Sequence, residues 1–509
     1  MAPAAREPPL PSGSATVTCL MRRTRVSTGG DIETGRATPI AGAATDVLVV
    51  GAGLAGLTIA RELARAGRAV SVVERSGAVG GLARTFRYGG FFFDVGPHRF
   101  HTEDAEVAGL LAGALEGELL EIPRASAVRA FGRYHAWPLR PSVLASLPPR
   151  LLLRCGLELL RRERLAGDSF EAEVVNRYGR TLYEEFFAPY TQRFLSLPPG
   201  EVHRDWARAG MDRAVIDRRY RADGLWALAR STFLRRSPDT RFLYPSAGIG
   251  TLAERLAAGV AAAGGRVLLG ADVTSLEVAG DRIRAATAGG VRIEVGGVVW
   301  TGAITGAARL LGAPAGGLEF ISTVLYNLEL ARPARIAQQQ WVYFGGGEEF
   351  VRVSVPAAFS GAALPAGRGS LCVECTCREG DGRWLGAEER LGSVVDDLVR
   401  VGAIASGREV VAAHVERVPD SYPVYGLEYP DALRGCLEAL RRYPNLLLAG
   451  RSGRFWYNNM DHSIAQGLRI ARGLAACEAL ADVDVGEREF WRDPGRPPRG
   501  APSSRASGR

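Results

Sequence analysis

Residues 46–74 read DVLVVGAGLAGLTIARELARAGRAVSVVE, and this stretch decides the fold. An apolar segment over 46–50 runs directly into the pattern Gly-x-Gly-x-x-Gly at Gly51, Gly53 and Gly56, and helical spacing follows over 57–66. Gly51 permits a tight turn, Gly53 lets the backbone approach a pyrophosphate, and Gly56 lets the helix contact the strand closely. A strand, this motif and a helix in succession predict a dinucleotide-binding site.

A carboxylate follows at the spacing that such a site requires. The second predicted strand, 69–73, ends at Glu74, roughly 20 residues beyond the glycines. A carboxylate there accepts hydrogen bonds from ribose hydroxyls and repels a 2′-phosphate. The N-terminus of the intervening helix faces the negative phosphates. The acid therefore strengthens the prediction of a dinucleotide site.

A second glycine turn directly follows this unit. Arg75 comes after the acid, and residues 80–85 then read GGLART, a flexible turn with an arginine that can pair with a phosphate. The string resembles the opening motif of flavin amine oxidases, protoporphyrinogen oxidases, phytoene desaturases and UDP-galactopyranose mutases. This resemblance favours FAD over NAD as the cofactor. It implies that Arg75, Gly81 and Arg84 contribute to the FAD site.

The loop after this turn carries histidine. Residues 91–102 read FFFDVGPHRFHT, and they are similar to the histidine loop that covers the flavin in the mutases and in bacterial protoporphyrinogen-oxidase-like proteins. An imidazole beside a flavin can relay protons at neutral pH. A lone histidine is more often structural, but this loop holds two of the chain's six. We therefore expect His98 to act in catalysis.

A further motif lies near the end of the chain. Residues 445–461 read NLLLAGRSGRFWYNNMD, and helical spacing continues over 462–479. An apolar strand, a Gly-Arg step and a capped helix together favour an anion. Reduced flavin is an anion at N1, so a helix N-terminus at that edge favours the reduced state. The resemblance implies that Gly450, Met460 and Asp461 contact FAD.

The same segment carries the substrate prediction. In the mutases, the matching arginine and the tyrosine six residues later hold the diphosphate of the substrate, and these residues are Arg451 and Tyr457 here. The mutase carboxylate two residues further on is replaced by Asn459. The resemblance therefore implies catalytic roles for Arg451 and Tyr457. At Asn459, however, this sequence departs from the mutase pattern.

The middle of the chain resembles the same families less specifically. Residues 137–139 (WPL) and 168–191 look like the helical substrate segment, but Gln192 and Arg193 stand where the family pattern continues with lysine and tryptophan. Residues 244–252 resemble the return of the chain to the flavin domain. The strand that follows implies an adenine contact at Val273.

These motifs predict an α/β fold with a discontinuous, Rossmann-like two-dinucleotide-binding FAD domain and an inserted α+β substrate domain. The expected parts follow one another along the chain. They are a disordered leader (1–44), FAD-domain parts (45–110, 244–305 and 426–482), a helical substrate part (111–243), a substrate-domain sheet (306–425) and a disordered tail (493–509).

Composition narrows the function. The chain is 47% hydrophobic and 23% charged, as globular proteins are. Its net charge of +8 is spread along the chain rather than gathered in a block, which argues against nucleic acid as a partner. All 63 cationic side chains are arginine. The absence of lysine excludes a Schiff-base lysine, a lysine base and the lysine-bridged water of several amine oxidases.

Location and metal binding can also be addressed. No secretory signal is recognisable, Met21 is an alternative start, and no run of 18 apolar residues exists. Residues 143–160 are broken by prolines and arginines, which leaves open a helix lying on a membrane surface. We expect a cytoplasmic protein.

Three cysteines lie close together in a predicted strand. We expect Cys372, Cys375 and Cys377 to be buried, reduced thiols, and no metal site is predicted.

Three activities remain open. The first is an FAD-dependent oxidoreductase that transfers a hydride from a small organic substrate to flavin N5. The second is redox-neutral isomerisation of a nucleotide sugar by reduced flavin, as in UDP-galactopyranose mutase. The third is a flavoprotein without catalysis.

Overall fold

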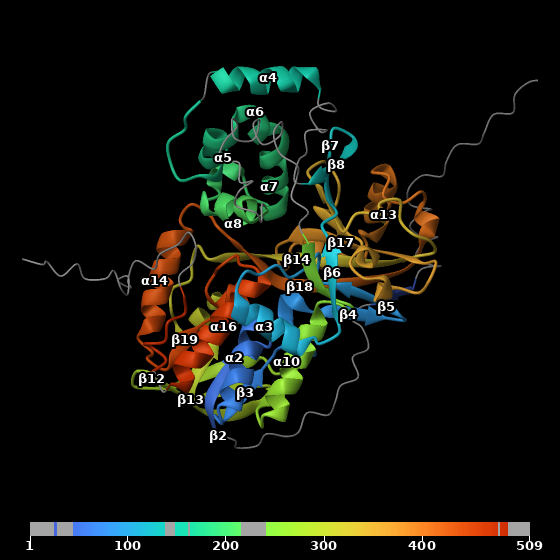
Figure 1. Cartoon of the computed structure of the whole chain (residues 1–509). Helices are drawn as coiled ribbons and strands as arrows, with labels where there is room; N and C mark the ends of the chain where they lie inside the picture. Colours follow the sequence, from blue (N-terminus) through green and yellow to red (C-terminus); the bar gives the residue numbers. More distant parts are fainter. Residues whose placement is uncertain are drawn as a thin grey trace, which may run out of the picture. The chain divides into compact units, whose positions relative to one another are not determined.

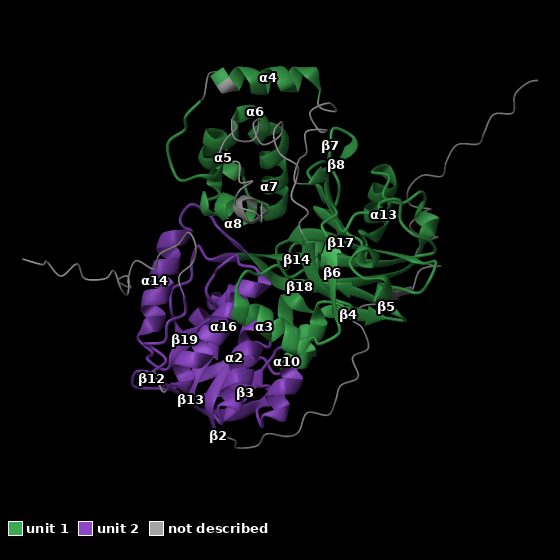
Figure 2. Cartoon of the chain, viewed as in Figure 1, with its two compact units in different colours: residues 1–36, 78–256, 320–422 green, residues 37–77, 257–319, 423–509 purple. Residues whose placement is uncertain are grey.

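The computed structural model describes residues 25–27, 44–137, 148–160, 163–214, 241–476 and 479–486 (Figure 1). The chain divides into two compact units, each made of three separate stretches (Figure 2). Unit 1 comprises 1–36, 78–256 and 320–422, and unit 2 comprises 37–77, 257–319 and 423–509. This division groups 78–110, which the sequence assigns to the FAD domain, with unit 1.

Unit 2 is built on a seven-stranded sheet in the order β10-β3-β2-β13-β12-β11, with β19 also paired to β13. The pairs β10–β3, β3–β2, β2–β13 and β13–β19 are parallel, and β11–β12–β13 is an antiparallel meander. The strands are β2 (Ala44–Val50), β3 (Val70–Val73), β10 (Arg266–Leu268), β11 (Val273–Ala279), β12 (Arg282–Ala288), β13 (Val291–Trp300) and β19 (Leu446–Leu448).

Unit 2 also contains helices. They are α2 (Leu54–Arg65), α11 (Ile304–Leu311), α14 (Tyr429–Arg441), α15 (Gly450–Gly453) and α16 (Met460–Ala475). Parallel neighbours need a crossover, and α2 supplies it between β2 and β3. Leu57, Ala60 and Leu63 recur at helical spacing on its buried face. The predicted parallel, dinucleotide-binding α/β fold is confirmed.

Unit 1 contains an eight-stranded sheet in the order β1-β18-β14-β17-β16-β15-β7-β8. Its strands are β1 (Arg25–Ser27), β7 (Ser126–Ala130), β8 (Arg133–Trp137), β14 (Glu319–Leu330), β15 (Trp341–Phe344), β16 (Arg352–Ser354), β17 (Gly369–Cys377) and β18 (Val410–Val424). Two further strand pairs are β4 (Thr85–Tyr88) with β5 (Phe91–Asp94), and β6 (Leu119–Pro123) with β9 (Arg241–Pro245).

Unit 1 also contains helices, and the division between the units falls within α10 (Gly250–Ala262). The others are α3 (Ala105–Ala114), α4 (Pro149–Leu160), α5 (Phe170–Tyr178), α6 (Arg180–Leu182), α7 (Ala188–Leu195), α8 (Asp205–Ala214), α12 (Gly382–Leu385) and α13 (Leu391–Arg400). A π-helical turn, Tyr183–Phe187, joins α6 to α7. Short 3-10 turns occur at Gly81–Ala83, Pro199–Glu201, Pro356–Ala358, Gly361–Ala363 and Gly407–Glu409.

The core of unit 1 includes the cysteine-rich strand. β17 is buried along its whole length, and its two faces differ. One face carries Leu371, Val373, Cys375 and Cys377 into the core, and the other carries Ser370, Cys372, Glu374 and Thr376. Cys372, Cys375 and Cys377 are free thiols, as the sequence predicts. Burial raises the pKa of Cys372 and of Cys377 to about 12, so both thiols remain protonated. Among the described residues, no cluster of histidine, cysteine and acidic side chains suits a metal ion.

Part of the predicted leader is described. β1 pairs in parallel with Ala412–His414 of β18. The other residues of 1–43, the tail 493–509, and Pro138 and Leu139 lie outside the described residues. Within the described part of the chain, no helix is both long enough and apolar enough to cross a bilayer.

Candidate active site

The glycine turn between β2 and α2 has the geometry that its sequence predicts. Gly51 has a backbone φ of +100°, and a Cβ there would come within 2.5 Å of Thr301 Oγ1. A Cβ on Gly56 would lie 2.1 Å from the carbonyl oxygen of Gly51. A Cβ on Gly53 would meet no atom within 4 Å among the described residues. Gly51 and Gly56 therefore allow close contacts inside the turn, whereas Gly53 leaves space for a ligand.

Glu74 holds this turn in place. Its Oε2 accepts a hydrogen bond from the N–H of Ala52 at 2.8 Å, and its Oε1 accepts from the N–H and the hydroxyl of Ser76 at 2.9 and 2.8 Å. An ionised carboxylate offers about four acceptor positions. Glu74 therefore retains capacity for a ribose hydroxyl while it fixes the loop that would contact the pyrophosphate.

The strand edge beside Glu74 carries two more predicted cofactor residues. The carbonyl oxygen of Glu74 accepts from the N–H of Ala271, two residues before Val273, which begins β11 and is buried. Arg75 is exposed. Val273 thus belongs to the same end of the sheet as Glu74, where the resemblance places the adenosine part of FAD.

The C-terminal motif lies directly against the glycine turn. Gly450 has a φ of +73°, and a Cβ there would stand 3.2 Å from Ala55 Cβ and 3.5 Å from Thr301 Cβ. Its N–H donates to Gln466 Oε1 at 2.6 Å. Two stretches that lie about four hundred positions apart are therefore neighbours at the start of α2.

Thr301 links these two stretches. Its N–H and its hydroxyl both donate to the carbonyl oxygen of Val50, each at 2.8 Å. It follows the last residue of β13 and faces both Gly51 and Gly450. Sequence reasoning missed Thr301 and Gln466, because neither belongs to a motif.

Arg451 and Tyr457 are brought together by the loop between α15 and α16. The guanidinium carbon of Arg451 lies 4.5 Å from the centre of the Tyr457 ring, a cation–π distance. Its Nη1 donates to the carbonyl oxygen of Asn458 at 3.2 Å. Between them, Phe455 is fully buried with a φ of +49°. A backbone strained in this way persists only when the surrounding structure holds it.

Asn459 has a structural role at this point. It is exposed, and it forms a reciprocal capping box with His462 at the N-terminus of α16. Met460 and Asp461, the predicted cofactor contacts, are the first residues of that helix. Asn459 therefore organises the helix start, and it provides no carboxylate where the mutase pattern has one.

In unit 1, the second glycine turn joins the segment that returns from the inserted domain. Thr85 Oγ1 donates to Asp94 at 2.6 Å and accepts from the N–H of Gly250 at 2.8 Å. Asp94 also accepts from the hydroxyl of Tyr244 at 2.6 Å. Burial raises the pKa of Asp94 to about 6, against the opposing effect of these hydrogen bonds. Sequence reasoning missed this buried carboxyl group.

The predicted residues Gly81 and Arg84 lie in the same segment. Gly80 and Gly81 both have positive φ, at +107° and +54°. The guanidinium carbon of Arg84 lies 4.3 Å from the centre of the Phe86 ring. The turn thus needs its glycines, and Arg84 is held over an aromatic face in unit 1.

The His98 loop lies against a buried ion pair in unit 1. Gly96 has a φ of +73°, and a Cβ there would stand 2.7 Å from Glu374 Oε2 and 3.3 Å from Arg352 Nη2. His98 Nδ1 is 3.4 Å from the carbonyl oxygen of Gly96, and the side chain is half-buried. Arg352 Nη2 donates to both oxygens of Glu374, at 2.8 and 2.6 Å, and to the hydroxyl of Tyr422.

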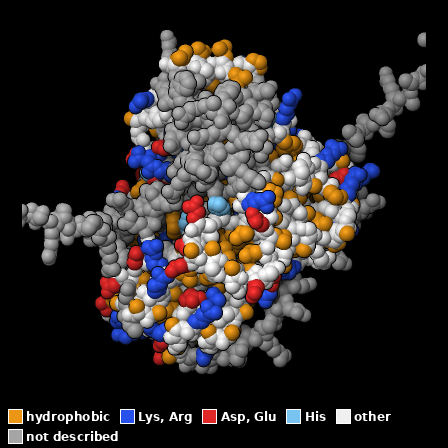
Figure 3. Space-filling model, viewed as in Figure 1, with side chains coloured by type: hydrophobic (Ala, Val, Ile, Leu, Met, Phe, Trp, Pro, Cys, Tyr) orange, Lys and Arg blue, Asp and Glu red, His pale blue; other side chains and the backbone are white. Residues whose placement is uncertain are grey.

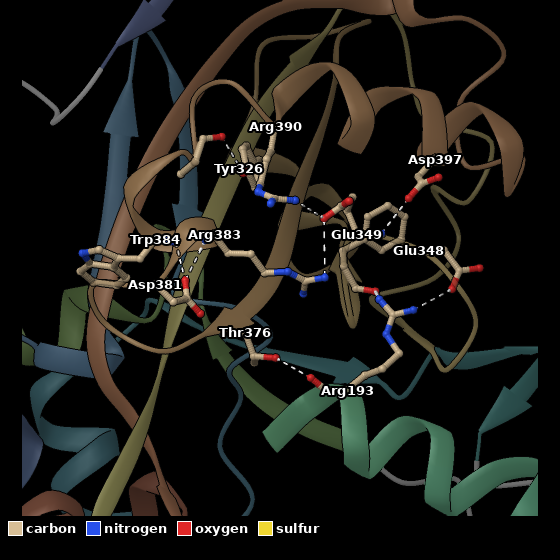
Figure 4. A network of polar contacts seen from close by, with 12 residues as sticks. Arg193, Tyr326, Glu348, Glu349, Thr376, Asp381, Arg383, Trp384, Arg390 and Asp397 are labelled. Carbon is tan, nitrogen blue, oxygen red and sulfur yellow. Dashed lines mark hydrogen bonds and ion pairs between the residues drawn. The ribbon is translucent and has the colours of Figure 1, made fainter. Parts of the chain in front are cut away.

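Arg193, at the departure from the family pattern, belongs to a second polar network. Its Nη1 lies 3.8 Å from a carboxylate oxygen of Glu348. Figure 4 shows the two side chains pointing toward each other. The neighbouring Glu349 contacts Arg390 and Arg383 at 3.3 and 3.8 Å. The arginine that replaces the expected residue therefore ties α7 to the turn before β16.

The glycine turn of unit 2 suits a dinucleotide cofactor. Gly53 leaves space at the turn, and no acidic side chain occupies the first turn of α2, so the helix N-terminus is suited to a pyrophosphate. Unit 2 holds Gly51, Gly53, Gly56, Glu74, Arg75, Val273, Gly450, Arg451, Tyr457, Met460 and Asp461, whereas unit 1 holds Gly81, Arg84 and His98.

Solved structures resemble this fold. A reduced UDP-galactopyranose mutase matches with a TM-score of 0.71 and 19% identity, over 86% of this chain and 97% of that one. A putative protoporphyrinogen oxidase from Exiguobacterium sp. 255-15 matches with a TM-score of 0.67 and 16% identity, over 85% and 99%. At these identities the likeness shows the fold alone, and it confirms the predicted architecture.

Sequence comparison identifies the family. A phytoene dehydrogenase of Streptomyces griseus is 29% identical over 303 residues, which cover 54% of this chain and 57% of that protein. The match thus spans less than two thirds of this relative. The family model described as flavin containing amine oxidoreductase matches residues 54–475, which is most of the sequence. The chain therefore belongs to the flavin containing amine oxidoreductase family.

Proposed function

We propose that this chain is an FAD-dependent oxidoreductase that transfers a hydride from a carbon atom of a small organic substrate to flavin N5. The glycine turn carries the proposal, because Gly51 and Gly56 need their small size and Gly53 faces open space. When bound, FAD supplies the hydride acceptor, and oxygen or another acceptor reoxidises it. Membership of the family supports this general class of reaction.

The protein's part is to bind and orient the cofactor. The N–H groups at the start of α2 would receive the pyrophosphate, and Glu74 would accept a ribose hydroxyl. The start of α16 would stabilise negative charge on the reduced flavin. The proposed FAD contacts are Gly51, Gly53, Gly56, Glu74, Arg75, Gly81, Arg84, Val273, Gly450, Met460 and Asp461.

Proton transfer must use groups other than lysine, because the chain contains none. We assign this role to His98, whose loop is held by the close contact of Gly96 with Glu374. The lysine-bridged water of several amine oxidases is absent for the same reason. Oxidation of a carbon skeleton is therefore favoured over simple amine oxidation.

A second candidate is redox-neutral isomerisation of a nucleotide sugar by reduced flavin. The stacking of Arg451 on Tyr457 favours it, because a guanidinium held on a ring has the charge and geometry to pair with a diphosphate. Asn459 argues against it, since this residue caps α16 in place of the mutase carboxylate. The hydride-transfer proposal therefore takes precedence.

One experiment distinguishes the two reactions. Purified protein reconstituted with FAD is incubated with UDP- and dTDP-sugars, with and without dithionite, and separately with apolar and amine substrates in air. Peroxide release, or reduction of an added acceptor, by the oxidised enzyme supports the oxidoreductase. Sugar isomerisation that requires reduced flavin supports the mutase instead. A protein that takes up no FAD contradicts both proposals.

A further inference from the structure

The outer face of α4 is apolar, which is unusual for a helix at a protein surface. Leu153, Leu157 and Leu160 follow one another at helical spacing, and their exposed fractions are 65%, 56% and 80%. Leu152 beside them is 37% exposed. Figure 3 shows apolar atoms gathered at the top of the view, where Figure 1 places α4. Single exposed leucines are common, but three on one helical face mark an interaction surface.

The opposite face of α4 fixes this orientation. Leu151 is buried, and Glu158 accepts hydrogen bonds from the N–H and the hydroxyl of Thr181 at 3.0 and 2.7 Å. Gly179 has a φ of +89°, and a Cβ there would stand 2.2 Å from Glu158 Oε2. The helix cannot turn its leucines inward without breaking these contacts.

The sequence of α4 and of the residues just after it is basic. Arg150 and Arg154 lie in α4, and the sequence continues with Arg161, Arg162 and Arg164. The acids of this stretch are only Glu158 and Glu163, and the whole chain carries a net charge of +8. Arg154 is half exposed and pairs with Glu184 at 3.0 Å and with Glu185 at 3.7 Å. A helix with leucines on one face, in an arginine-rich stretch of sequence, is typical of a helix that lies in a membrane interface.

The size of the face favours a bilayer over a second protein chain. At about 1.5 Å per residue, a helix of 12 residues is about 18 Å long, too short to span a membrane. A face of that length, about 10 Å wide, is far smaller than the roughly 800 Å² that each partner buries in a stable complex. A bilayer requires no matching surface.

We propose that α4 docks on an anionic lipid bilayer, with its leucines at the boundary of the acyl chains and its arginines at the lipid phosphates. Arginine stems can lie along the apolar layer while their guanidinium groups stay among the headgroups. Lipid anions within a Debye length supply the complementary charge. This docking is independent of the reaction that the flavin performs.

Vesicle sedimentation tests the proposal on the full chain loaded with FAD. The vesicles are phosphatidylcholine alone, or phosphatidylcholine with about 30% phosphatidylglycerol. The wild type should sediment with the anionic vesicles, and added salt should weaken its binding. Replacing Leu153, Leu157 and Leu160 together by serine should weaken binding roughly tenfold or more. The matched control is Leu385→Ser in α12, which removes a leucine that is 68% exposed and should leave binding unchanged.

Two further measurements keep the test decisive. If circular dichroism shows that the triple variant is unfolded, the single variant Leu160→Ser replaces it. In a separate measurement, brominated lipids should quench the fluorescence of a tryptophan introduced by Leu153→Trp. Failure of the folded wild type to bind anionic vesicles overturns the proposal. So does a wild-type dimer that becomes monomeric in the leucine variant without any binding to lipid, because the face would then join two copies of the chain.

Discussion

Glu74 Oε2 accepts a hydrogen bond from the backbone N–H of Ala52 at 2.8 Å, so the acid at the end of β3 holds the first glycine turn. Replacing Glu74 by glutamine leaves an amide that cannot accept from both Ala52 and Ser76. Leaving a buried donor without its acceptor costs about 1–3 kcal/mol. We expect Glu74→Gln to weaken FAD binding roughly tenfold, as measured by titrating the apoprotein with FAD.

Glu62→Gln provides the matched control for this substitution. Glu62 lies on α2 and pairs at the surface with Arg61 and Arg65. Surface pairs contribute only about 0–1 kcal/mol, so the FAD affinity of this variant should match that of the wild type. Equal FAD affinities for the Glu74 and Glu62 variants would show that Glu74 does not organise the site.

Gly450 provides a second test of the cofactor site. Gly450→Ala places a methyl group 3.2 Å from Ala55 in a residue with a φ of +73°. Gly67→Ala is the control, because Gly67 has a φ of +78° but no atom within 4 Å of the added Cβ. Both variants carry the backbone strain of about 1–2 kcal/mol, and only Gly450→Ala adds crowding of about 1–3 kcal/mol. Denaturant unfolding should show the larger loss for Gly450→Ala, together with lower FAD content.

Asp94 should make stability depend on pH. Its pKa is about 6 in the folded chain and about 3.9 in an unfolded one. The folded state therefore binds the extra proton between these values, and stability falls as the pH rises from about 4 to about 6. The fall is on the order of 2–3 kcal/mol for a shift of this size.

Asp94→Asn removes this titrating group while keeping an oxygen that accepts from Tyr244 or Thr85. The difference in unfolding free energy between wild type and variant should change across this pH window and remain flat above about pH 7. Asp431→Asn removes an aspartate that is 80% exposed and serves as the control. A difference that does not vary with pH would contradict the assignment.

The local part of the fold could be predicted because its determinants are close in sequence. Residues 44–74 contain β2, the glycine turn, α2 and β3. Hydrophobic spacing or the glycine pattern predicts each of them. The helix begins at Leu54, three residues before the periodic stretch, because Gly53 already occupies the N-cap position. The neighbourhood of Gly51 and Gly450 could be anticipated only through the resemblance of both motifs to one group of families.

The residues that sequence reasoning missed act through distant partners. Thr301 bonds to Val50 across 251 positions, and Tyr244 bonds to Asp94 across 150. A single threonine or aspartate has no periodic pattern, so the sequence gives no sign of such pairs. The exposed leucines of α4 could not be predicted from the sequence either. Leucines at helical spacing normally indicate a buried face, so the pattern alone gives the wrong side.

The contributions of Arg352 and Glu374 to the free energy of unfolding should depend on each other. Their side chains are 12% and 3% exposed, so removing one partner leaves the other charge buried. Such a loss costs about 3–5 kcal/mol. We expect Glu374→Gln and Arg352→Met each to lower the free energy of unfolding by this amount. The double variant should lose much less than the sum, and additive losses in a double-mutant cycle would contradict this dependence.

UDP binding by the Arg451 variant distinguishes the two proposed reactions without any measurement of catalytic turnover. A diphosphate clamped by Arg451 predicts that the reduced holoprotein binds UDP, and that Arg451→Ala loses about 1.5–3 kcal/mol, roughly tenfold to a hundredfold in affinity. The control is Arg442→Ala, because Arg442 stacks on Tyr443 at 4.8 Å and bonds to the carbonyl oxygen of Leu311. Calorimetric titration with UDP measures the affinity of both variants.

If the wild type binds no UDP, the nucleotide-sugar proposal is wrong and only the hydride-transfer proposal remains. If it binds UDP and only the Arg451 variant loses affinity, the mutase reading gains the stronger support despite Asn459.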